Sequence, residues 1–138
     1  MDIRKINDSI SVAPQIGPQD MKALAEMGFR TVINNRPDGE APDQTPAAEM
    51  EEAARQAGLA YRFVPVISGH LTRDNVDDFA AALADVETPV LAYCRSGTRS
   101  ATLWALSQAG KAPADEIVAQ AAAAGYDMSP FRAALDGE

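Results

Sequence analysis

The sequence predicts an α/β fold with a central, mostly parallel sheet of about four to five strands flanked by helices. Short apolar runs rich in β-branched residues alternate along the chain with longer helical stretches, and turn-forming residues separate them. There is no internal repeat. The 138 residues fit a single domain, residues 1–138, and are enough to bury a core without a disulfide or a metal site.

Four runs have the apolar character of buried strands. The last of them ends directly before the only cysteine, Cys94, and has the strongest core character. The expected strands are residues 10–13, 31–34, 61–66 and 89–93.

The intervening stretches carry the start and stop signals of helices. Pro18 suits a first helical turn, Thr45 and Thr72 are good N-caps, and Gly28 and Gly58 are suitable C-terminal stops. The expected helices are residues 18–27, 45–58, 72–86, 100–109, 113–124 and 130–135, with Trp104 packed in the core.

The charge balance limits the possible partners. A formal net charge of −8 argues against nucleic acid and anionic membranes, which require broad positive surface. No apolar run approaches the roughly 20 residues of a membrane span, and the N-terminus does not resemble a signal peptide. With one cysteine there can be no internal disulfide, and the zinc patterns built on several cysteines are excluded. We therefore expect a cytoplasmic protein.

Cys94 begins the segment that carries chemistry. It ends a strand, and the loop behind it turns directly into a helix. The backbone N–H groups of such a loop form an anion-binding nest, and the helix N-terminus adds positive charge. These features favour a reactive thiolate over an inert buried cysteine. The anion-binding loop is Arg95, Ser96, Gly97 and Thr98, followed by Arg99 and Ser100, and the last two join Cys94 as expected catalytic residues.

The loop and the whole chain resemble two different families. The Cys94–Ser100 loop is similar to the active-site loop of single-domain rhodaneses, which are sulfurtransferases. The chain as a whole resembles the beta-lactamase-hydrolase-like (DUF442) family, whose fold is similar to that of dual-specificity phosphatases. The stretches that carry this second resemblance are residues 10–15, 32–40 and 93–104. The resemblance implies a cysteine-phosphatase-like scaffold with phosphatase or sulfurtransferase chemistry.

The spacing within the loop favours sulfur transfer. Cysteine phosphatases carry His-Cys, five residues and then Arg. Here Tyr93 precedes Cys94, four residues separate Cys94 from Arg99, and Ser100 stands where a phosphatase has its arginine. The shorter loop is the rhodanese pattern, and a tighter loop suits one bound sulfur atom better than a tetrahedral phosphate.

The expected general acid is also missing. A cysteine phosphatase protonates its leaving group with an aspartate from a neighbouring loop. The corresponding residues 66–71 contain no carboxylate, and Asp74 lies beyond the Thr72 cap. His70, the only histidine, can act as an acid or be an ordinary solvated loop residue. Sulfur transfer needs no strong acid, because sulfite or a thiolate leaves as a stable anion.

Arg36, with Asp38 and Glu40, follows a strand that should neighbour the Cys94 strand. These residues can line the rim of the site or form a solvated turn. Arg36 and His70 are therefore candidate rim residues.

The sequence thus favours a rhodanese-type sulfurtransferase. Cys94 would take sulfur from a small anionic donor, thiosulfate or a low-molecular-weight persulfide, and pass it as a persulfide to a thiol or cyanide. The alternative is a phosphatase that acts on a phosphoester through a Cys94 phosphocysteine. A third possibility is a non-catalytic anion-binding or sulfur-sensing module. None of the three requires a metal or another cofactor.

Overall fold

The four expected strands lie side by side in one sheet in the computed structural model, which describes residues 1–137. A short fifth strand joins them at one edge, and the strand order is β1-β2-β5-β3-β4. β1 pairs antiparallel with β2, and the other pairs are parallel. The strands are β1 (Arg4–Lys5), β2 (Ile10–Ala13), β3 (Thr31–Asn34), β4 (Ala60–Phe63) and β5 (Val90–Tyr93). This confirms the predicted fold class.

The register of the sheet brings the functional loops together. Ala13, Tyr93, Asn34 and Phe63 are aligned across β2, β5, β3 and β4, and each is the last residue of its strand. The loops that follow these strands therefore leave the sheet from one edge, where ligands bind in open α/β folds.

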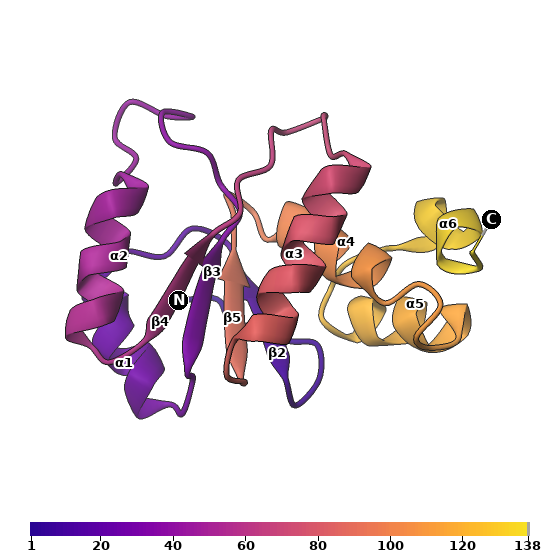
Figure 1. The fold of residues 1–138 in the computed structure, drawn as a ribbon, viewed down its shortest axis with the longest axis horizontal. Helices are drawn as coiled ribbons and strands as arrows, with labels where there is room; N and C mark the ends of the chain where they lie inside the picture. Colours follow the sequence, from indigo (N-terminus) through magenta and orange to yellow (C-terminus); the bar gives the residue numbers. More distant parts are fainter. Residues whose placement is uncertain (138) are drawn as a thin grey trace.

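Helices cover both faces of the sheet (Figure 1). One face carries α1 and α2, and the other carries α3 to α6. The α-helices are α1 (Met21–Glu26), α2 (Ala47–Gln56), α3 (Arg73–Asp85), α4 (Thr98–Ser107), α5 (Ala114–Ala123) and α6 (Arg132–Leu135). Two 3₁₀-helices, η1 (Pro18–Asp20) and η2 (Ser129–Phe131), precede α1 and α6.

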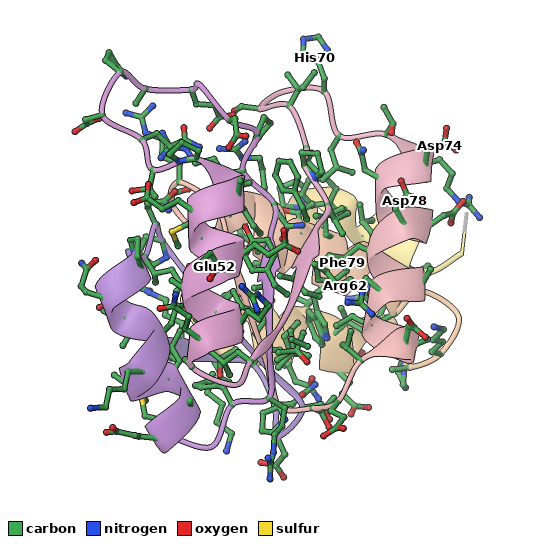
Figure 2. All side chains as sticks on the ribbon, turned by 60° about the vertical axis from the view of Figure 1, so that its left-hand side comes forward. Glu52, Arg62, His70, Asp74, Asp78 and Phe79 are labelled. Carbon is green, nitrogen blue, oxygen red and sulfur yellow. The ribbon has the colours of Figure 1, made fainter. Side chains whose placement is uncertain are left out.

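Each face has its own hydrophobic core. On the α2 side, Met50 packs with Leu91 and Tyr93 of the central strand β5. On the other side, Phe79 of α3 and Trp104 of α4 pack with Val90. Trp104 is 3% exposed, which confirms its predicted place in the core. In Figure 2, Phe79 points from α3 towards the sheet, whereas Glu52 lies on α2.

Several element ends differ from the sequence prediction. Thr72 does cap α3, accepting the Asn75 N–H, but the N-cap of α2 is Pro46 and not Thr45. The strand expected to reach Val66 ends at Phe63, although the Val64 and Val66 N–H groups still donate to the Asn34 and Asn35 carbonyls at 2.9 and 3.0 Å. β1 was not predicted, since two exposed, charged residues carry no strand pattern.

No helix within residues 1–137 combines the length and the apolar character that a membrane span requires.

Candidate active site

Cys94 directly follows β5 and lies at the base of the edge where the four aligned strands end. Its backbone N–H donates to the Ala13 carbonyl at 3.4 Å, which ties the start of the loop to β2. The cysteine is fully buried, with 0% of its surface exposed. The Gly97 N–H donates to its Sγ at 3.1 Å. The buried sulfur therefore accepts a hydrogen bond from the backbone of its own loop.

Gly97 makes the sharp turn between this loop and α4. Its φ is +91°, in the left-handed region that L side chains avoid, and it is the N-cap of α4. A Cβ at this position would lie 2.1 Å from the Tyr126 hydroxyl oxygen. Both the backbone conformation and the space require glycine here.

The loop has a set of free backbone donors. Five of its N–H groups have no hydrogen-bond partner among residues 1–137, and three of them belong to the first turn of α4, where helical partners do not exist. These donors are the N–H groups of Arg95, Ser96, Thr98, Arg99 and Ser100. Together with Gly97 they belong to the segment for which the sequence predicts an anion-binding nest.

Arg99 adds a fixed positive charge to this nest. Its Nη1 and Nη2 donate to the two carboxylate oxygens of Glu40 at 2.7 and 2.8 Å, and Nη1 also donates to the Val66 carbonyl at 2.8 Å. The pKa of Arg99 is raised, first by its bond to Glu40 and further by the neighbouring Cys94. The other edge of the guanidinium, Nε with the second Nη2 hydrogen, bonds to no oxygen within residues 1–137, and its neighbouring acceptor is Cys94, which helps to raise the pKa of Arg99. This edge suits an oxyanion bound beside Cys94, which would accept two parallel hydrogen bonds.

Glu40 also binds a second arginine. The Nε of Arg36 donates to Glu40 Oε1 at 2.9 Å, and its Nη1 donates to Gln15 Oε1 at 3.1 Å. The hydrogen bond from Arg99 and then that from Arg36 lower the pKa of Glu40 to about 2, against the opposing effect of burial. Glu40 is therefore a carboxylate at neutral pH and has no proton to donate.

Arg36 is more buried than its sequence context predicted. It is 5% exposed, so it belongs neither to an open rim nor to a solvated turn. A buried guanidinium is stable here because Glu40 and Gln15 satisfy it. Asp38 is exposed, and its side chain accepts the Ala47 N–H at the start of α2 at 2.7 Å.

Ser100 connects α4 to the loop after β3. Its hydroxyl donates to Asn35 Oδ1 at 2.8 Å, and Asn35 Nδ2 donates to the Val64 carbonyl at 2.9 Å. The Asn35 N–H donates to the Tyr93 carbonyl at 2.8 Å, next to the cysteine. The Ser100 hydroxyl proton is thus used in the scaffold, and only its backbone N–H is available to a ligand.

The remaining loop side chains face the solvent. Arg95, Ser96 and Thr98 are exposed, and the Ser96 hydroxyl donates to Thr98 Oγ1 at 3.2 Å. The Arg95 carbonyl accepts the Gln15 N–H at 3.2 Å. Arg95 therefore supplies positive charge at the surface, while Arg99 supplies it inside.

Neither candidate acid is directed to this site. His70 is exposed at the tip of the loop between β4 and α3 and points away from the body of the molecule (Figure 2). Asp74, in the first turn of α3, is exposed as well. From this loop only the Val66 carbonyl binds a residue of the cysteine loop.

Known structures share this architecture. A phosphatase-type structure from Neisseria meningitidis Z2491 has a TM-score of 0.85 at 36% identity, covering 99% of this chain and 98% of its own. A DUF442 structure from Shewanella putrefaciens CN-32 has a TM-score of 0.76 at 20% identity, covering 99% and 85%. Tk-PTP in its active form has a TM-score of 0.72 at 12% identity, covering 97% and 92%. The fold is thus that of the protein-tyrosine-phosphatase-like cysteine phosphatases.

Sequence comparison then gives the family. Residues 2–111 match the family described as beta-lactamase hydrolase-like protein, phosphatase-like domain, and the chain belongs to this family. A beta-lactamase hydrolase-like protein of Xylella fastidiosa Temecula1 is 41% identical over 130 residues, which are 93% of this chain. One of Agrobacterium fabrum C58 is 38% identical over 105 residues, or 76% of this chain. The chain spans 30% and 24% of the length of these two relatives.

These matches confirm the resemblance that the sequence showed to the beta-lactamase-hydrolase-like family. They favour the phosphatase alternative over the sulfurtransferase interpretation.

Proposed function

We propose that this domain is a cysteine-dependent phosphatase that acts through a Cys94 phosphocysteine. The observation that carries the proposal is the set of free donors around the sulfur: backbone N–H groups of the loop and the free edge of Arg99. Three phosphoryl oxygens accept about six hydrogen bonds, whereas the single outer sulfur of a persulfide accepts fewer. Donors arranged around a nucleophile stabilise the charge that develops on a transferred phosphoryl group.

The proposed reaction has two chemical steps. The Cys94 thiolate attacks phosphorus, an S–P bond forms, and the P–O bond to the leaving group breaks with its electron pair going to that oxygen. Water then attacks the phosphocysteine, releasing inorganic phosphate and the thiolate. The Gly97 N–H, 3.1 Å from Sγ, stabilises the thiolate before attack and after release.

The leaving group is constrained by the missing acid. Glu40, with its pKa near 2, is ionised at neutral pH, and His70 is exposed at the tip of its loop. A leaving oxygen must therefore depart without a proton from these side chains, which favours aryl esters and phosphoanhydrides over alkyl esters.

The test is turnover of an aryl phosphate by the purified protein. We expect hydrolysis of p-nitrophenyl phosphate, competitive inhibition by vanadate, and at least about a 100-fold lower rate with a simple alkyl phosphate. The control is Cys94→Ser, which keeps the loop but removes the nucleophilic sulfur. Turnover that survives this substitution would refute the proposal.

A second function has its own supporting observations, namely the four-residue spacing between Cys94 and Arg99 and the lack of a directed acid. Both suit a rhodanese-type sulfurtransferase that takes sulfur from thiosulfate or a low-molecular-weight persulfide and transfers it to a thiol. A reducing cytoplasm suits either chemistry, because the thiol must stay reduced. Sulfite release from thiosulfate, without aryl phosphatase activity, would favour this second function. Oxyanion binding without either turnover would leave a non-catalytic anion-binding module.

A further inference from the structure

Tyr126 reaches the cysteine loop from outside the part of the chain that matches the family model. That match ends at residue 111, whereas Tyr126 lies between α5 and η2. Tyr126 is 8% exposed, and its hydroxyl donates to the Ser96 carbonyl at 3.3 Å. The Arg4 guanidinium lies over its ring, 5.7 Å from the centroid, and donates to the Ala124 carbonyl at 3.3 Å. The ring is therefore held in place from β1 and from its own segment.

The Ser96 carbonyl and the Gly97 N–H belong to the same peptide unit. Because a peptide unit is planar and trans, its C=O and N–H point in opposite directions. Tyr126 donates to one side of this unit, and the other side donates to Cys94 Sγ at 3.1 Å. A donor on the carbonyl polarises the peptide and strengthens the hydrogen bond that its N–H makes.

We infer that Tyr126 is a positioning residue that fixes and polarises the Ser96–Gly97 peptide and so stabilises the Cys94 thiolate. The inference rests on the proposed function only in taking Cys94 as the nucleophile, and it holds for phosphoryl or sulfur transfer alike. The C-terminal segment is then part of the active-site apparatus, beyond its role in packing.

None of the charged side chains that the structure describes near the loop makes the hydrogen bond that Tyr126 donates to the Ser96 carbonyl. The charged side chains of the elements around the loop are Arg99 on α4, Glu40 and Arg36 after β3, exposed Arg95 in the loop, and Arg4 on β1 with its partner Asp2. Burial, opposed by Arg4, raises the pKa of Tyr126, so the phenol keeps its proton and remains a donor at neutral pH. Among residues 1–137 it is the only side chain that donates to the Ser96 carbonyl.

The test compares Tyr126→Phe with the wild type in the pH dependence of Cys94 alkylation by iodoacetamide. Loss of the hydroxyl should raise the midpoint of alkylation by about 0.5 pH units, because the thiolate loses part of its stabilisation. The matched control is Thr31→Val, which removes a buried hydroxyl that donates to the Glu87 carbonyl at 2.8 Å and lies at the start of β3, at the opposite end of the sheet from the cysteine loop. Its midpoint should equal that of the wild type. An unchanged midpoint in Tyr126→Phe, or equal shifts in both variants, would overturn the inference.

A second variant separates polarisation from packing. Site-specific 3-fluorotyrosine at position 126 keeps the ring and is a stronger hydrogen-bond donor, so the midpoint should move in the opposite direction, to lower pH. A shift to higher pH would show that only the fit of the ring matters and would contradict the inference. Alkylation is measured without substrate, so these outcomes stand even if neither phosphatase nor sulfurtransferase turnover is found.

Discussion

Two loops leave the same edge of the sheet and contribute very differently to the site. The loop between β3 and α2, residues 35–46, provides three side chains to the site. Asn35 accepts a hydrogen bond from Ser100, Glu40 accepts from Arg99, and Arg36 donates to Glu40. The loop between β4 and α3, residues 64–72, provides only backbone carbonyls, that of Val66 to Arg99 and that of Val64 to Asn35, and His70 points into solvent. This difference supports the proposal of a site that holds an anion without protonating a leaving group.

The largest effect should come from breaking the contact between the first loop and Arg99. Arg99→Lys leaves one ammonium group in place of a guanidinium that binds Glu40 and still offers a free edge. We expect kcat/KM for an aryl phosphate to fall about 100-fold, because the bidentate contact to the oxyanion is lost.

The matched variants are Arg95→Lys in the exposed part of the loop and Arg55→Lys on α2. Arg95→Lys should lower kcat/KM by no more than about threefold, since it changes only charge at the surface. Arg55 is exposed and its ion pair with Glu52 lies on α2, so its substitution should leave kinetics unchanged. Equal losses for Arg99→Lys and Arg95→Lys would contradict the geometry.

An intermediate effect should appear in stability against pH through Glu40. Its pKa is lowered from 4.5 to about 2 by Arg99 and Arg36. A depressed folded-state pKa means that the stabilisation is present above about pH 4.5 and is lost as the pH falls towards 2. Since 21% of the Glu40 side chain is exposed, solvent screening limits the contribution to about 1–2 kcal/mol at pH 7.

Urea unfolding of the wild type and Glu40→Gln at several pH values measures this contribution. The two proteins should differ in free energy of unfolding at pH 7 and converge towards pH 2. Glu52→Gln, in the exposed pair on α2, should show a smaller difference. Parallel pH profiles for the wild type and Glu40→Gln would mean that Glu40 is not held by the two arginines.

The smallest effect should come from the second loop. His70→Ala should change kcat and KM for an aryl phosphate less than about twofold, and the pH–rate profile should not change. Loss of an alkaline limb from that profile would show that His70 moves to the site as a general acid when substrate binds, and the contrast between the loops would then disappear.

The sequence predicted most of the fold because local signals determine it. β-branched runs, the Thr72 cap and the glycine stops lie within each element and need no long-range information. The exceptions depend on pairing with a neighbouring strand: β4 ends at Phe63, and β1 is two charged residues that become a strand only beside β2.

The site was predicted only where its parts are adjacent in sequence. The cysteine loop is one continuous segment, so its donors and Gly97 were predictable. The Arg99–Glu40 pair joins residues 59 apart, and the Tyr126–Ser96 bond joins residues 30 apart, so no spacing rule predicts either. The choice between Arg95 and Arg99 as the inward charge likewise depends on how α4 packs against the sheet.

The most direct test of the central claim is the intact mass of the protein, quenched in acid during turnover of an aryl phosphate. A phosphocysteine intermediate should add about 80 daltons at Cys94, and Cys94→Ser should show no such gain. No gain with the phosphoester, together with a gain of about 32 daltons on Cys94 after thiosulfate, would contradict the phosphatase and establish sulfur transfer in its place.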